Sequence, residues 1–89
     1  MILKFKKENE TAFQVRPNPT DGKITVEYFK TEKLEECKFK VYDLMGKLIL
    51  LGNIEAGNNR IDISSGKPGI YVLELFSNST QQQYKIVKQ

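Results

Sequence analysis

The stretch CKFKVYDLMGKLILL, residues 37–51, decides the fold class of this chain. In its first half Cys37, Phe39 and Val41 are apolar, and a lysine lies between each pair of them. An apolar period of two places these side chains on one face of a half-buried strand. The same pattern predicts that Cys37 is a small buried hydrophobe and not a reactive nucleophile.

The second half of this stretch predicts a hairpin. Asp43-Leu44-Met45-Gly46 joins the first strand to the apolar run at residues 48–51, in the manner of a four-residue hairpin. Gly46 lacks a Cβ, so it can take the positive φ that such a turn needs. Two strands joined this closely run antiparallel, and so the stretch favours an antiparallel all-β fold.

Working outward, similar short runs recur along the chain and are separated by clusters rich in Gly, Pro, Asn and Ser. The further strands that we expect cover residues 13–16, 24–29, 61–63, 70–76 and 84–88, with turns at 17–22, 56–59, 64–69 and 77–80. Residues 70–76 are apolar on both faces except Glu74, which predicts a central strand. About seven strands, roughly 8–14 residues apart, predict an antiparallel β-sandwich. Residues 31–37 have one strong apolar anchor, Leu34, and are interpreted as a loop.

Length and composition exclude several classes of protein. The 89 residues have room for one small domain, and the net charge of +3 comes from basic and acidic residues that are mixed along most of the chain. Nucleic-acid binding is therefore not expected. No apolar run approaches the ~18 residues of a membrane span, so membrane insertion is not expected either. The chain has no histidine and one cysteine, which argues against an enzyme, a metal site or a cofactor.

Three aspartates, Asp21, Asp43 and Asp62, lie in or beside turns and are the acidic candidates for a ligand site. Acidic side chains with loop carbonyls can bind Ca²⁺, but the dense acidic ladder of a calcium loop is missing. We expect Asp21 and Asp43 to accept hydrogen bonds from the backbone of their own turns.

Four stretches carry a family resemblance when they are taken in order. They are VRPNP at 15–19 followed by Gly22, VYDLMGK at 41–47, GIYV at 69–72 and the terminal YKIVKQ at 84–89. Together, over about residues 12–89, they resemble the C-terminal sorting domain of the type IX (Por) secretion system of Bacteroidetes. One departure is Arg16, since relatives often carry an aromatic residue before the PNP motif.

The resemblance implies a non-enzymatic module at the end of a larger secreted protein, with an immunoglobulin-like β-sandwich fold. The parent would enter the periplasm with an ordinary signal peptide. The domain would then direct it through the outer-membrane type IX machinery to the cell surface or the extracellular space. A sortase-like peptidase commonly removes such domains, and the cargo is often attached to an anionic lipopolysaccharide.

The resemblance also divides the motif residues by role. A structural role is expected for Pro17, Asn18, Pro19, Gly22, Asp43, Gly46, Lys47, Gly69 and Tyr71. In particular, Tyr71 can bury its ring while its hydroxyl bonds nearby backbone. Docking on the translocon is expected at Lys85, Ile86, Val87, Lys88 and Gln89.

The basis for this docking expectation is the charge and the position of the tail. Lys85 and Lys88 fall on opposite faces of an unbroken strand, and both can be exposed near the chain end. An edge strand offers unpaired backbone to a partner, and cations steer it toward an acidic patch. Plain solubility is the alternative explanation of these lysines.

Residues 1–11 are expected to be a linker or an added segment, and residues 12–89 the sorting domain. No signal peptide or cargo precedes the domain, which suggests a piece of a longer parent. Two alternatives remain open. The first is a carbohydrate-binding or adhesive sandwich, which would present exposed rings such as Phe29, Tyr42 and Phe76. The second is a structural immunoglobulin-like module of a multidomain surface protein.

Overall fold

A computed structural model describes residues 13–29, 36–78 and 81–89 of the chain. Expectations about the linker at 1–11, and about most of the loop at 31–37, lie outside these residues. The described residues form seven strands, as the apolar periodicity predicts. They are β1 (Phe13–Arg16), β2 (Lys23–Tyr28), β3 (Cys37–Asp43), β4 (Leu48–Ile54), β5 (Gly57–Asp62), β6 (Gly69–Ser77) and β7 (Gln81–Lys88).

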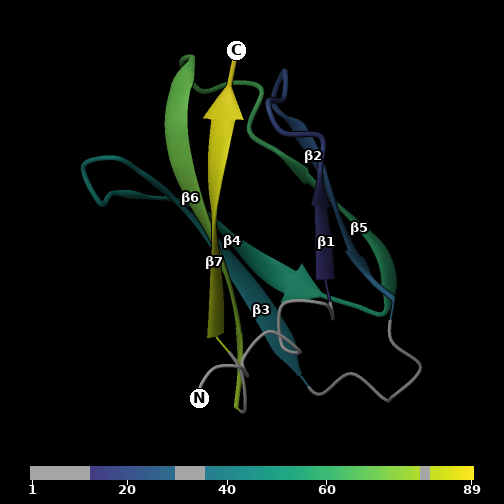
Figure 1. Ribbon diagram of the computed structural model, residues 1–89. Coiled ribbons are helices and arrows are strands. Elements are labelled where there is room, and N and C mark those ends of the chain that lie inside the picture. Colours follow the sequence, from purple (N-terminus) through teal and green to yellow (C-terminus); the bar gives the residue numbers. More distant parts are fainter. Residues whose placement is uncertain (1–12, 30–35, 79–80) are drawn as a thin grey trace, which may run out of the picture.

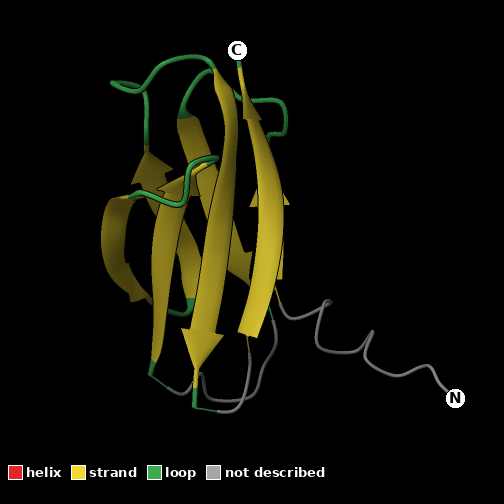
Figure 2. Ribbon diagram, turned by 90° about the vertical axis from the view of Figure 1, so that its left-hand side faces the viewer, coloured by secondary structure: helices red, strands yellow, loops and turns green. Residues whose placement is uncertain are grey.

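The strands form two antiparallel sheets. One has the order β1-β2-β5 and the other the order β4-β3-β6-β7. The two sheets lie as separate layers in both ribbon views (Figures 1 and 2). Strand β6 pairs with β3 on one side and with β7 on the other, so residues 70–76 do form a central strand. The prediction of an antiparallel all-β fold is confirmed.

Both sheets contribute apolar side chains to one core between the layers. The alternating residues of β3 that predicted the strand, Cys37, Phe39 and Val41, are all buried there. Facing residues come from the other sheet, where Ile24 and Val26 are 2% and 0% exposed. The remaining buried apolar residues are Phe13, Ile54, Ile61, Ile63, Tyr71, Leu73, Leu75 and Ile86. A period of two therefore located the core correctly in each sheet.

One predicted turn is partly wrong. Residues 56–59 were expected to be a break, but β5 already begins at Gly57, which pairs with Tyr28 of β2. The side chain of Asn59 explains the tight corner. It accepts a hydrogen bond from the Glu55 N–H and donates one to the Glu55 carbonyl, both at 2.8 Å. Because this amide satisfies the corner's backbone, the strand can start earlier than the Gly-Asn-Asn composition suggests.

Candidate docking site

The PNP motif lies against the last strand, although the two are distant in sequence. The Asn18 amide donates to the Lys85 carbonyl at 2.7 Å and accepts from the Val87 N–H at 2.9 Å. Thr20 continues the contact, because its N–H donates to the Val87 carbonyl at 2.9 Å and its carbonyl accepts from the Gln89 N–H at 2.8 Å. We call residues 18–20 together with 85–89 the C-terminal clasp. It brings the first and last family motifs together.

The clasp changes two expectations about the tail. Lys88 was expected to dock on the translocon, with exposure near the chain end making this possible, but it is only 7% exposed because it lies on the same face of β7 as the fully buried Ile86. Lys85 is exposed, as expected, and Gln89 is exposed as well. The expectation of an unpaired backbone edge is also wrong for residues 85–89, because residues 18–20 already bond to it.

The turn before β2 supports the clasp. Thr20 is 2% exposed, and its Oγ1 accepts from the Gly22 N–H at 3.0 Å and donates to the Lys23 carbonyl at 2.9 Å. Asp21 accepts from the Lys23 N–H at 3.1 Å, which confirms its predicted turn role. Gly22 has a φ of +122°, and a Cβ there would lie 2.5 Å from the Ser64 Cα. Sequence reasoning missed Thr20, whose one signal was its place directly after the PNP motif.

The second pair of motifs forms the tip of the β3–β4 hairpin and the loop beside it. The Asp43 Oδ1 accepts from the N–H groups of Met45 and Lys47, both at 2.9 Å, and the Asp43 N–H donates to the Lys47 carbonyl at 3.0 Å. Gly46 has a φ of +85°. Both observations confirm the expected turn chemistry of Asp43 and Gly46.

Tyr71 anchors the neighbouring loop, as predicted. Its ring is 6% exposed, and its hydroxyl donates to the Lys67 carbonyl at 2.6 Å. The loop passes close to that hydroxyl, since a Cβ on Gly66 would lie 2.6 Å from the Tyr71 Oη. Gly69 is the first residue of β6, which is where the sequence predicted the loop to enter the central strand.

Between the hairpin tip and this loop lies a groove of about 560 Å³. We call it the tip groove, and it is lined by residues 43–45, 47, 49 and 66–71. In its lining Leu44 and Met45 are 68% and 92% exposed, and Lys47 and Lys67 are exposed as well. The Asp43 carboxylate in its lining already accepts hydrogen bonds from the turn. The groove therefore combines apolar surface with positive charge.

Phe29, Tyr42 and Phe76, the rings that an adhesive sandwich would present, do not form a sugar-binding platform. Phe29 is 49% exposed just after β2, whereas Tyr42 of β3 and Phe76 of β6 are only partly exposed and belong to the other sheet. The Lys40 ammonium lies over the Phe76 ring, 5.0 Å from its centroid. This cation occupies one face of the ring that a sugar would need.

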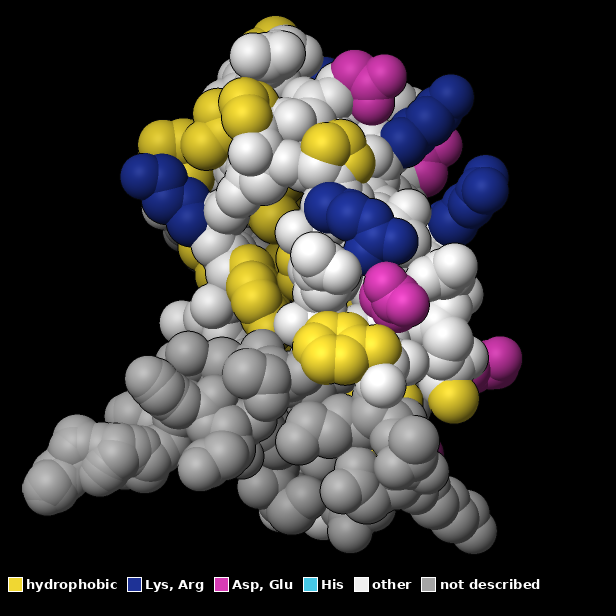
Figure 3. Space-filling view, turned by 45° about the vertical axis from the view of Figure 1, so that its right-hand side comes forward, with side chains coloured by type: hydrophobic (Ala, Val, Ile, Leu, Met, Phe, Trp, Pro, Cys, Tyr) yellow, Lys and Arg dark blue, Asp and Glu magenta, His cyan; other side chains and the backbone are white. Residues whose placement is uncertain are grey.

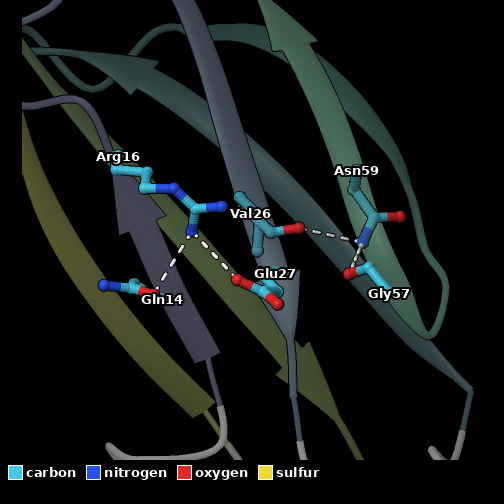
Figure 4. A network of polar contacts seen from close by, with 6 residues as sticks. All are labelled: Gln14, Arg16, Val26, Glu27, Gly57 and Asn59. Atoms are coloured by element: carbon cyan, nitrogen blue, oxygen red, sulfur yellow. Dashed lines mark hydrogen bonds and ion pairs between the residues drawn. The ribbon is translucent and has the colours of Figure 1, made fainter.

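On the three-stranded sheet the charges are mixed and partly paired. Figure 3 shows the side of the molecule that carries β1, β2 and β5, where basic and acidic side chains are interspersed. Arg16, which departs from the family pattern, donates to Glu27 at 3.0 Å and to Gln14 at 3.3 Å (Figure 4). It therefore lies on the outer face of β1, and the buried Phe13 remains on the inner face.

Among the titratable groups of the described residues, the pKa values of Cys37 and Asp62 are shifted, and neither group belongs to a reactive cluster. Burial raises the pKa of the Cys37 thiol, although backbone hydrogen bonds at Phe76 and Lys38 partly oppose that shift. Hydrogen bonds from the side chain and backbone of Ser64 lower the pKa of Asp62. Within residues 13–29, 36–78 and 81–89, no group of three acidic, Cys or His side chains could hold a metal ion. The same residues contain no helix able to cross a membrane.

Comparison with known proteins gives one family. A family model described as a secretion system C-terminal sorting domain matches residues 14–89. The matched range includes all the motif residues that form the C-terminal clasp and the tip groove. No curated protein matches the chain.

Proposed function

Since the chain belongs to the family of type IX secretion C-terminal sorting domains, we propose that it directs a larger cargo protein, fused in front of it, across the outer membrane. The family is one of sorting signals that the type IX machinery recognises, and not a catalytic family. Membership implies export to the cell surface or the extracellular space. In our proposal the cargo passes through the periplasm before it reaches the translocon.

The proposed mechanism is recognition of a folded immunoglobulin-like sandwich. Two antiparallel sheets with their apolar faces inward support this assignment. At the cell surface, a sortase-like peptidase would release the cargo or attach it to the membrane surface. The family match begins at residue 14, so a cut in front of that residue would remove the whole domain.

We place translocon docking at the tail, with its residues divided by exposure. Lys85 and Gln89 would touch the machinery, together with the half-buried Val87. The buried Ile86 and Lys88 would hold the strand in place. The observation that carries this proposal is the C-terminal clasp, which fixes the backbone of residues 85–89 on the sandwich. A lysine presented from a fixed strand can steer an acidic partner and fix its register.

A charge reversal tests this proposal more sharply than a deletion. Removing residues 84–89 would also remove Ile86 from the core, so mislocalisation of that variant would report unfolding. We would fuse residues 12–89 to a reporter with a signal peptide in a type IX-competent host. Lys85→Glu should then leave the reporter in the periplasm.

The matched control is Arg60→Glu, which reverses an exposed charge on β5 of the other sheet, opposite Thr25. It should reach the surface like the parent fusion. Both variants would be checked for folding by circular dichroism. If folded Lys85→Glu is exported as well as Arg60→Glu, docking does not depend on Lys85. If the parent fusion itself stays in the periplasm, the sorting role is wrong.

A further inference from the structure

The tip groove is a hollow with apolar residues on both of its sides. Its volume of about 560 Å³ lies within the range of about 300–1,000 Å³ that small-ligand pockets occupy. One side is the β3–β4 hairpin tip, which projects from the sandwich (Figure 1), and the other is the loop before β6. Ile49 lines it from β4 and is 41% exposed, and the half-buried Ile70 lines it from β6. A partner's apolar side chain can therefore be covered from two sides.

The hairpin tip also exposes two large apolar side chains that its own turn does not need. Asp43 and Gly46 satisfy the turn chemistry, and Leu44 and Met45 between them are largely exposed. Polar residues would serve equally well at both positions of such a turn. Methionine is flexible and polarizable, and it is common on surfaces that adapt to a partner. These two side chains therefore indicate binding and not folding.

One lysine lies on each side of the groove. Lys47 comes from the hairpin and Lys67 from the loop, and neither forms an ion pair with another described residue. Two backbone hydrogen bonds with Asp43 hold Lys47, and the Tyr71 hydroxyl holds the Lys67 carbonyl. The Asp43 Oδ1, also in the lining, already accepts two hydrogen bonds from the turn. The groove therefore complements a ligand with carboxylates beside an apolar side chain.

The groove continues the surface of the tail. On the outer face of the four-stranded sheet, Ile70 pairs with Val87, and the next outward pair is Val72 with Lys85. Directly opposite side chains of an antiparallel pair have Cβ atoms about 5 Å apart. Because Ile70 also lines the groove, one partner can contact the tail and enter the groove without leaving the protein surface.

Building on the sorting role proposed above, we propose that the tip groove binds an acidic segment of the type IX machinery. An apolar side chain of that segment enters between Ile49 and Ile70, and carboxylates beside it pair with Lys47 and Lys67. Such an anchor in a pocket, with charges around it, is the usual centre of a protein interface. A protein segment fits better than an anionic lipid surface, because a narrow chain can enter a groove and a flat bilayer cannot.

The chemistry of the groove is tested with the purified 89-residue chain and a model peptide. Backbone amide shifts would be followed by NMR while acetyl-Glu-Leu-Asp-Phe-Glu-amide is added to millimolar concentration. We expect saturable shifts at residues 44–49 and 66–71. A control peptide with Gln and Asn in place of Glu and Asp should bind at least about fivefold more weakly, since it forms no ion pair with either lysine.

Matched variants separate the groove from general effects of charge and hydrophobicity. Lys47→Glu and Lys67→Glu should each weaken peptide binding at least about threefold, whereas Lys47→Arg and Lys67→Arg should bind like the parent. Arg60→Glu, on the other sheet, should have no effect. Met45→Ser should weaken binding about threefold, and Leu51→Ser, at an exposed apolar residue outside the groove lining, should not. Circular dichroism would verify that each variant is folded.

Three results in solution overturn the proposal. The first is an acidic peptide that produces no saturable shifts at the groove, and the second is a neutral peptide that binds equally well. The third comes from vesicles of phosphatidylglycerol and phosphatidylcholine as a second probe. If they shift residues 44–49 and the acidic peptide does not, the hairpin tip binds a lipid surface.

Export of the reporter fusion in a type IX-competent host tests the partner. The double variant Lys47→Glu/Lys67→Glu should stay in the periplasm, whereas Arg60→Glu should reach the surface. If the folded double variant is exported like Arg60→Glu, the machinery does not use the groove, and this proposal is wrong while the sorting role stands. If the parent fusion itself is not exported, the sorting role is wrong and the proposal is overturned with it.

Discussion

The side-chain amide of Asn18 accepts a hydrogen bond from the Val87 N–H at 2.9 Å, across a separation of 69 residues. The same amide donates to the Lys85 carbonyl at 2.7 Å. An amide side chain carries a donor and an acceptor side by side, and so it can replace one step of a strand ladder. This gives a physical reason for an asparagine in the PNP motif, where the flanking prolines have no N–H groups to donate.

We expect Asn18→Ala to destabilise the domain by about 1–3 kcal/mol, since it leaves a donor and an acceptor of β7 without their partner. Urea unfolding followed by circular dichroism would measure the loss. Asn58→Ala removes an exposed amide from β5 and should change stability by less than about 0.5 kcal/mol. Equal stability of the two variants would contradict a structural role for Asn18.

Gly22 and Gly46 both have positive φ, but they should respond differently to alanine. At Gly46 a Cβ meets nothing within 4 Å, so Gly46→Ala should cost only the ~1–2 kcal/mol of an unfavourable φ. At Gly22 the new Cβ would lie 2.5 Å from the Ser64 Cα, and backbone cannot yield as a side chain end can. We therefore expect Gly22→Ala to lose at least about 2 kcal/mol more, as measured by urea unfolding. Equal losses would show that Ser64 moves away freely.

The sequence predicted the strands, the core residues and the turn chemistry well, because these depend on local pattern. Alternation in residues 37–41 located the inner face of β3. Asp43 accepts a hydrogen bond from its turn backbone and Gly46 takes a positive φ, as the turn chemistry predicts. The same alternation, applied to the tail, places Lys88 on the inner face with Ile86. Lys88 is buried because β7 keeps its period of two up to this residue, although the chain ends one residue after it.

Contacts between distant segments could not be predicted in this way. Nothing local to residues 17–20 indicates that they bond to residues 85–89, since that contact depends on the arrangement of the two sheets. The apolar run at residues 48–51 predicted a strand but not its position at an edge. A run that is apolar on both faces fits a central strand equally well, so exposure of Leu51 became visible only in the structure.

Gly66 and Tyr71 should behave as a coupled pair. Tyr71→Phe removes the hydrogen bond to the Lys67 carbonyl and should cost about 0.5–1.5 kcal/mol. Gly66→Ala should be destabilising because its Cβ would lie 2.6 Å from the Tyr71 Oη. In the double variant that oxygen is absent, so we expect a total loss smaller than the sum of the two single losses. A double-mutant cycle by urea unfolding measures the difference, and strict additivity would contradict the close contact.

Cys37 should make the stability of the domain fall at alkaline pH. Burial raises the pKa of its thiol above the ordinary value near 9, because the thiolate is disfavoured in the core. Below the unfolded pKa both states keep the proton, and the full stabilisation is present. As the pH rises toward the folded pKa the unfolded state loses its proton first, and stability is lost. Tyrosines and lysines titrate in the same range, so the parent chain must be compared with a variant that lacks only the thiol.

Cys37→Ala provides that comparison. It should cost about 1–2 kcal/mol at pH 7, because it removes a buried sulfur atom. Its free energy of unfolding should then fall less steeply than that of the parent between pH 8 and 10.5, as measured with urea under reducing conditions. The curves of the two proteins would converge as the pH rises. Parallel curves would mean that the thiolate is accommodated in the folded domain, and that Cys37 is less well buried between the sheets than its 2% exposure indicates.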